Sequence, residues 1–93
     1  MKGELSTLRP KLAPSVVTRE AAGERVIVQP ASAELAILNE VAARIVLLVD
    51  GQRTVDDIVG AIVDEYAVTV ERAGVDVATF LDDLAARGMI EWQ

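Results

Sequence analysis

The sequence contains no cysteine and no histidine. The absence of cysteine excludes disulfides, thiolate metal sites and thiol nucleophiles together. The absence of histidine removes the side chain best suited to proton transfer near neutral pH, which is also the commonest metal ligand. The only serines, Ser6, Ser15 and Ser32, therefore have no imidazole to activate them. We predict that the chain is not an enzyme and that it needs neither a metal nor another cofactor.

Aromatic residues and long apolar runs are also scarce. Aromatics make up 3% of the chain against 52% hydrophobic residues, so the core must consist of Val, Ile, Leu and Ala. The longest apolar stretch, residues 41–49, is interrupted by Arg44 and is less than half of a membrane span. Residues 1–4 lead into no apolar segment of the kind that a secretion signal needs. We therefore expect a single cytoplasmic domain of 93 residues.

Phosphate-binding and nucleic-acid-binding features are missing as well. The six glycines are scattered and form neither G-x-G-x-x-G nor G-K-[ST]. Residues 1–30 hold five basic and three acidic side chains (+2), whereas residues 31–93 hold four basic and twelve acidic ones (−8). Such a field repels phosphate backbones, so we expect no nucleic acid as a partner.

Three pairs of adjacent acidic residues are present: Asp56-Asp57, Asp64-Glu65 and Asp82-Asp83. Paired carboxylates sometimes hold a cation or share a proton. On a helix, however, adjacent side chains point about 100° apart and do not meet. We interpret the pairs as solvated helix surface.

The first third of the sequence has the pattern of strands. Residues 1–14 contain two prolines and no clear period, which predicts an extended arm before a domain of residues 15–93. Residues 16–18 and 25–29 are rich in β-branched side chains on either side of a turn at 21–24, which predicts a hairpin. Glu34–Leu38 is either a third strand or the start of a helix. The strand is favoured because Asn39, a good N-cap, follows it.

Three helices are predicted after Asn39. The first runs from Glu40 to Asp50 with Gly51 as its C′ residue, and it is so apolar that it should be buried on every side. The second begins after Thr54 and the third after Thr69, each with an apolar stripe at helical spacing. The core stripe of the third helix consists of Val70, Ala73, Val77, Phe80 and Leu84. Residues 89–92 are a candidate final strand. The predicted class is α+β, with three strands followed by three helices.

Four segments resemble the PqqD family, the small proteins of pyrroloquinoline quinone biosynthesis and their relatives in other peptide-modification pathways. Residues 38–45 and 50–59 are similar to its core signature, residues 9–14 to its opening segment and residues 80–90 to its ending. The resemblance implies a winged-helix-like fold with a three-stranded antiparallel sheet followed by three helices. It also implies a domain that binds the leader segment of a ribosomally made precursor peptide and presents it to a modifying enzyme, often a radical S-adenosylmethionine enzyme.

The resemblance places the peptide beside the third strand. In related domains the leader is added there as an extra strand, packed against the third helix, so backbone hydrogen bonds supply affinity. The strand residues expected to bind peptide are Glu34, Leu35, Ala36, Ile37 and Leu38, of which Leu35 and Ile37 share one face. Their sequence does not indicate which pathway or which peptide the chain serves.

The third helix offers a candidate wall for the same site. One flank of its core stripe is expected to be wet and carries Asp76, Asp83 and Arg87. The other flank has mostly small side chains, and its candidate peptide-binding residues are Gly74, Ala78, Leu81 and Ala85, with Asp82 at the rim. This flank is either a shallow trough open to a peptide or a surface packed on the protein itself.

Two other functions fit the same pattern. An uncharged third-strand edge also suits a homodimerisation module, in which the edge pairs with a second copy of the chain. A winged-helix nucleic-acid reader has a similar order of elements, but its third helix should be basic, and here that helix is acidic.

Overall fold

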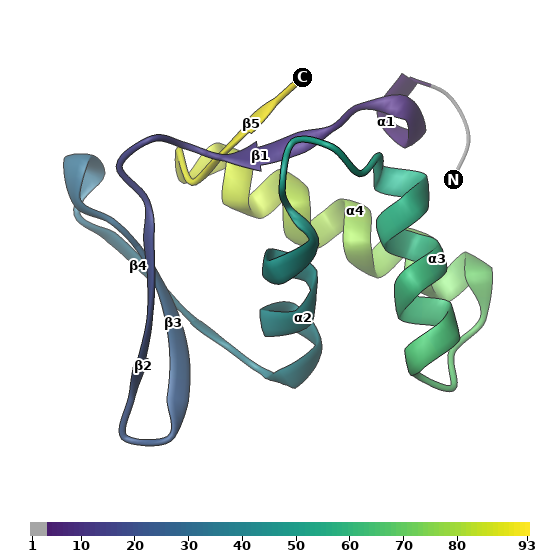
Figure 1. Ribbon diagram of the computed structural model, residues 1–93, viewed down its shortest axis with the longest axis horizontal. Helices are drawn as coiled ribbons and strands as arrows, with labels where there is room; N and C mark the ends of the chain where they lie inside the picture. Colours follow the sequence, from purple (N-terminus) through teal and green to yellow (C-terminus); the bar gives the residue numbers. More distant parts are fainter. Residues whose placement is uncertain (1–3) are drawn as a thin grey trace.

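The computed structural model of the chain describes residues 4–93 (Figure 1). Its elements are, in order, α1 (Glu4–Thr7), β1 (Pro10–Leu12), β2 (Val17–Ala21), β3 (Glu24–Gln29), the 3₁₀ turn η1 (Pro30–Ser32), β4 (Glu34–Leu38), α2 (Glu40–Leu48), α3 (Val55–Glu65), α4 (Val70–Ala86) and β5 (Ile90–Trp92). The predicted α+β fold, with a three-stranded antiparallel sheet followed by three helices, is confirmed. The third strand is confirmed with the predicted bounds.

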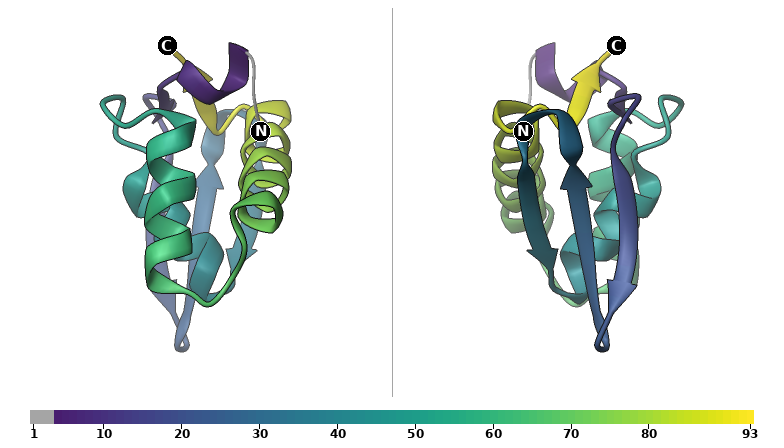
Figure 2. Two further views of the ribbon diagram at one scale, coloured as in Figure 1. Left: turned by 90° about the vertical axis from the view of Figure 1, so that its right-hand side faces the viewer. Right: turned by 90° about the vertical axis from the view of Figure 1, so that its left-hand side faces the viewer.

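The strands β2, β3 and β4 form an antiparallel sheet in that spatial order. A two-residue turn joins β2 to β3, and its residues Ala22 and Gly23 both have positive φ, 53° and 80°. This is the backbone of the primed hairpin turns, whose twist matches that of the flanking strands. The helices cover one face of the sheet and leave the other face open, as the two side views in Figure 2 show.

The helices begin where their caps predict. The side chain of Asn39 accepts a hydrogen bond from the Ala42 N–H at 2.8 Å. Thr54 and Asp57 form a reciprocal capping box at the start of α3, and Thr69 caps α4. The core between the helices and the sheet is aliphatic, as the composition requires. Its largest fully buried aliphatic side chains, apart from Pro10, are Ile27, Val55, Ile58, Val77, Leu81, Leu84 and Met89.

Two predictions for α2 are wrong, namely the residue at which it ends and its burial on every side. The helix ends at Leu48 with Val49 as its C-cap, so Gly51 is not the C′ residue. Gly51 does have a positive φ of 77°. Its N–H donates to the carbonyl of Pro10 at 2.9 Å, however, and not to a carbonyl of the helix. Directly after the helix, Asp50 and Gly51 lie against β1, where Asp50 forms a β-bridge with Lys11. The helix is also not buried all round, because Leu47 is 59% exposed.

The predicted N-terminal arm is built into the fold over its described part. Its strand β1 pairs antiparallel with β5, and Arg9 and Gln93 exchange two backbone hydrogen bonds of 2.9 Å. Pro10 and Ala13 are buried. The predicted final strand is confirmed by β5, whereas its partner β1 was not predicted. Residues 1–3 of the arm lie outside the described residues.

Candidate functional site

The three-stranded sheet has two edge strands, β2 and β4, and they differ in charge. All five residues of β2 are exposed, and Arg19 and Glu20 lie in its middle. Charged side chains of this kind discourage pairing with another chain. In β4 the only charged residue is Glu34, at the first position. Within residues 4–93, β3 is the only strand paired with β4, so its other edge is open and, beyond Glu34, uncharged.

The hairpin register decides which backbone groups of β4 point to the open edge. Ala21 and Glu24 close the two-residue turn, so Glu24 and every second residue after it bond to β2. The intervening residues of β3 therefore bond to β4, where their partners are Glu34, Ala36 and Leu38. The N–H and C=O groups of Leu35 and Ile37 consequently point away from β3, toward the open edge.

The side chains of β4 alternate as expected. Leu38 is buried and Ala36 half-buried, on the face toward the helices. Leu35 and Ile37 lie on the outer face, where they are 54% and 62% exposed. The prediction that these two residues share a face is confirmed. The open edge thus combines backbone groups that no strand pairs with and exposed aliphatic side chains.

The helix α4 reaches β4 through Arg87. One guanidinium nitrogen, Nη1, donates to the carbonyl oxygen of Leu35 at 3.4 Å and lies 3.7 Å from Oε1 of Glu34. The hydroxyl of Ser32 donates to the carbonyl of Arg87 at 3.5 Å. In Figure 2 (right), β4 is accordingly the strand of the sheet nearest to α4. The C-terminal end of α4 therefore lies against the start of β4.

The contact made by Arg87 identifies the flank of α4 that faces β4, and it is not the flank of small residues. At about 100° per residue, Arg87 lies across the helix from Ala78 and Ala85. Gly74 and Leu81 are buried, so the prediction of an open trough is wrong for these two, and the alternative of packing on the protein holds. Ala78 and Ala85 are half-buried and Asp82 is exposed, and their contact with a peptide stays a prediction.

Sequence reasoning missed the flank that carries Asp76, Phe80, Asp83 and Arg87. Its charges indicated a solvated surface, and Asp76 and Asp83 are indeed exposed, whereas Phe80 and Arg87 are half-buried. The available signal was Phe80, the only phenylalanine of the chain, because this member of the core stripe lies on the side next to the charged residues. Phe80 is half-buried, so its ring offers apolar surface to a neighbouring group.

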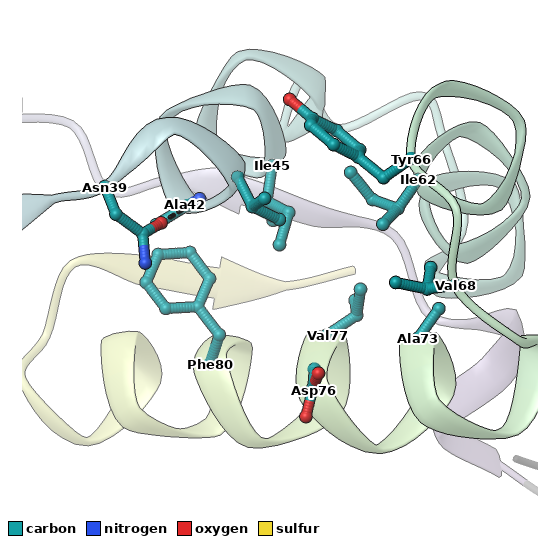
Figure 3. Close-up of a pocket in the computed structure, with 11 residues that line it drawn as sticks. Asn39, Ala42, Ile45, Ile62, Tyr66, Val68, Ala73, Asp76, Val77 and Phe80 are labelled. Atoms are coloured by element: carbon teal, nitrogen blue, oxygen red, sulfur yellow. Dashed lines mark hydrogen bonds between the residues drawn. The ribbon is translucent and has the colours of Figure 1, made fainter.

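A cavity of about 350 Å³ opens on the same flank (Figure 3). It lies between the start of α2, the end of α3 and the middle of α4. Its lining is mainly apolar and consists of Asn39, Val41, Ala42, Ile45, Ile62, Tyr66, Val68, Ala73, Asp76, Val77 and Phe80. We call it the apolar pocket. Asn39 is the residue that directly follows β4, so the pocket lies at the end of that strand.

The two points of proximity show that β4 and this flank of α4 run beside one another. From Arg87 back to Phe80 the helix rises about 10 Å, and from Leu35 on to Asn39 the strand advances about 13 Å. An extended segment laid on the open edge would thus have backbone partners along one side and α4 on the other. One end of this segment would lie at Arg87 and the other end at the apolar pocket. We call this arrangement the β4–α4 site.

The β4–α4 site offers hydrogen bonding and apolar surface. Among residues 4–93, no group of three acidic side chains is arranged to hold a metal ion. The Arg44 guanidinium lowers the pKa of Glu65 by hydrogen bonding, and the backbone N–H groups of Arg53 and Gln52 lower the pKa of Asp50. No helix in residues 4–93 is long and apolar enough to cross a membrane.

Residues 24–90, which include all of β3, β4 and the three long helices, match the family model for coenzyme PQQ synthesis protein D (PqqD). The chain belongs to the PqqD family. The matched residues contain the whole β4–α4 site. The family assignment made from four short segments of the sequence is confirmed.

Individual PqqD-family and structural relatives agree with this assignment. The chain is 29% identical to the PqqA binding protein of Rhizobium meliloti (strain 1021), over 88% of this chain and 92% of that protein. It is similar to TbiB1 in complex with the TbiA(beta) leader peptide, with a TM-score of 0.78 and 28% identity over 87% and 94% of the two chains. The PqqD truncation of Methylobacterium extorquens PqqCD, a RiPP recognition element, gives a TM-score of 0.72 and 25% identity over 88% and 87%.

Proposed function

We propose that this PqqD-family chain captures the leader segment of a ribosomally synthesised precursor peptide by strand addition to β4 and presents it to a modifying enzyme. The observation that carries the proposal is the open edge of β4, where Leu35 and Ile37 direct their backbone groups away from β3 beside α4. The names of the relatives support it, because one binds PqqA and another is in complex with a leader peptide.

A peptide strand added to β4 would use both its backbone and its side chains. Its backbone would bond to the N–H and C=O groups of Leu35 and Ile37, which supplies affinity without regard to sequence. Its side chains would point alternately to the two faces of the extended sheet. One set would face α4, with the apolar pocket at the end. The other set would extend the outer face beside Leu35 and Ile37.

The modifying enzyme in this proposal is a separate partner. The chain has no histidine or cysteine to perform acid–base or thiol chemistry, so its role is to bind and present. The family resemblance implies a radical S-adenosylmethionine enzyme as the partner. Co-purification of such an enzyme with the chain and the precursor tests this part of the proposal.

Proline substitution on the two sheet edges tests strand addition. Ile37→Pro removes an N–H that points to the open edge of β4, without removing a bond to β3. Thr18→Pro makes the same change on β2, where the Thr18 N–H points away from β3. The probe is chosen from a panel of synthetic precursor leaders that includes PqqA, and the one that binds the unmodified chain is called the leader peptide below.

We expect Ile37→Pro to weaken binding of the leader peptide at least about tenfold in calorimetric titration. Thr18→Pro should bind within about twofold of the unmodified chain. Circular dichroism verifies that both variants are folded. Equal affinities for the two variants would show that the peptide docks away from β4.

Homodimerisation is a second candidate function, because the exposed side chains of Leu35 and Ile37 would also suit a second copy of the strand. Sedimentation velocity of the chain with and without the leader peptide separates the two functions. A peptide-binding monomer keeps its mass apart from the added peptide. A dimer formed through β4 would dissociate as the peptide takes its edge.

A further inference from the structure

The open edge of β4 is partly occupied by the protein's own Arg87. The edge offers four backbone groups, the N–H and C=O of Leu35 and of Ile37. The carbonyl of Leu35 already accepts a hydrogen bond from Nη1 of Arg87 at 3.4 Å. A strand added to β4 would bring one of its own N–H groups to this same oxygen. The guanidinium therefore lies where the peptide backbone has to come.

Two carboxylates hold the guanidinium in this position. Nε of Arg87 lies 3.2 Å from Oδ2 of Asp83, one turn back on α4, and Nη1 lies 3.7 Å from Oε1 of Glu34 on β4. The pair with Asp83 is within one helix and can persist when the side chain moves. The contacts with Leu35 and Glu34 bridge two elements and are lost if the guanidinium leaves the edge.

We propose that Arg87 is a displaceable latch on the peptide-binding edge. In the free protein it caps the Leu35 carbonyl, and a leader strand takes its place. This inference rests on the function proposed above and adds a regulatory contact to the same site. The side chain of Arg87 is 36% exposed, so it has room to swing into solvent while it remains paired with Asp83.

The proposal predicts that removal of Arg87 strengthens binding of the leader peptide. If Arg87 only contributed a contact to the peptide, its removal would weaken binding. If the peptide has to displace Arg87, binding breaks the hydrogen bond from Arg87 to Leu35 and its partly exposed ion pair with Glu34. Removal of Arg87 avoids this cost. We therefore expect Arg87→Met, which keeps an unbranched apolar chain at this position, to bind the leader peptide about three- to tenfold tighter.

Arg53→Met is the matched control. It removes the same charge from an exposed arginine whose ion pair with Asp50 lies within the turn between α2 and α3. Both variants and the unmodified chain are titrated with the leader peptide by calorimetry, and thermal melts verify folding. Tighter binding by Arg87→Met alone supports the latch.

Three other outcomes overturn it. Weaker binding by Arg87→Met would make Arg87 a peptide contact, and unchanged binding would make its bond to Leu35 irrelevant. An equal gain with Arg53→Met would reduce the effect to net charge. The failure of the proposed function has a different result, because the unmodified chain would then bind no leader of the panel at all.

Discussion

Two leucines in helices, Leu84 and Leu47, have opposite surroundings. Leu84 is completely buried on the core stripe of α4, whereas Leu47 of α2 is 59% exposed. Removing three side-chain carbons leaves a cavity only where neighbours enclose the side chain. The two positions therefore separate the contribution of packing from that of helix propensity.

We predict that Leu84→Ala lowers the free energy of unfolding by about 2–5 kcal/mol. Leu47→Ala, the matched control, should change it by less than about 0.5 kcal/mol. Urea unfolding followed by circular dichroism measures both. A loss of several kcal/mol at Leu47 would mean that this side chain is enclosed in solution.

Two neighbouring alanines of α2 test the apolar pocket. Ala42 lines that pocket, whereas Ala43 lines a smaller cavity of about 180 Å³ near Leu47, away from the β4–α4 site. Both side chains are half-buried, so a larger residue at either position reaches open space rather than the closed core.

Ala42→Phe should fill part of the apolar pocket and weaken binding of the leader peptide at least about tenfold. Ala43→Phe should leave the affinity within about twofold. Fluorescence anisotropy of a labelled leader peptide measures both constants. An equal loss with the two variants would indicate a general disturbance of α2 rather than occupation of the pocket.

Among the elements, α2 and α3 are joined by a bidentate ion pair between Arg44 and Glu65. Nε of Arg44 donates to Oε1 of Glu65 at 2.8 Å, and Nη2 donates to Oε2 at 2.7 Å. The hydrogen bonds and the charge of Arg44 hold the pKa of Glu65 below its ordinary 4.5. Bidentate geometry makes this pair more effective than most surface ion pairs.

The pH dependence of this pair has a defined sign. Because the pKa of Glu65 is lower in the folded state than in the unfolded chain, its stabilisation is present above pH 4.5 and is lost as the pH falls through the folded pKa. We predict that Glu65→Gln lowers the urea midpoint at pH 7 and that the difference between the two proteins shrinks as the pH falls below 4.5. Asp64→Asn serves as the control for charge. A difference that persists at low pH would contradict the role of the ion pair.

The order of the elements was predictable because their signals are local. Asn39, Thr54 and Thr69 cap their own helices through nearby backbone groups. The early end of α2 was not predictable, because it depends on the hydrogen bond from Gly51 to Pro10, far away in the sequence. The pairing of β1 with β5 was missed for the same reason.

Of the candidate site, the strand β4 was predictable from the sequence and the flank of α4 was not. The strand Glu34–Leu38 was predicted because the local N-cap signal of Asn39 follows it, and the resemblance to the PqqD family placed the peptide beside it. The flank of α4 was misassigned because helical geometry places two flanks beside the core stripe and does not indicate which one meets β4. That choice depends on the tertiary contact between Arg87 and Leu35.

At the scale of the whole molecule, the described strands differ in how well their edges suit a partner. The helices cover the inner face of the sheet, and β2 carries charges along its edge. The strands β1 and β5 have only three residues each, with a charged residue, Lys11 or Glu91, in the middle. The edge of β4 is the remaining uncharged one among the described strands, and it lies beside both α4 and the apolar pocket. This combination is the structural basis of the proposed strand addition.

Residue-specific amide hydrogen exchange tests this claim most directly. In the free protein the N–H groups of Leu35 and Ile37 point away from β3, and so do those of Thr18 and Glu20 on β2. Exchange of all four is measured by NMR with and without saturating leader peptide. We predict that exchange slows at least about tenfold at Leu35 and Ile37 and remains unchanged at Thr18 and Glu20. Protection on β2 instead, or unchanged exchange at Leu35 and Ile37 with the peptide bound, would contradict strand addition to β4.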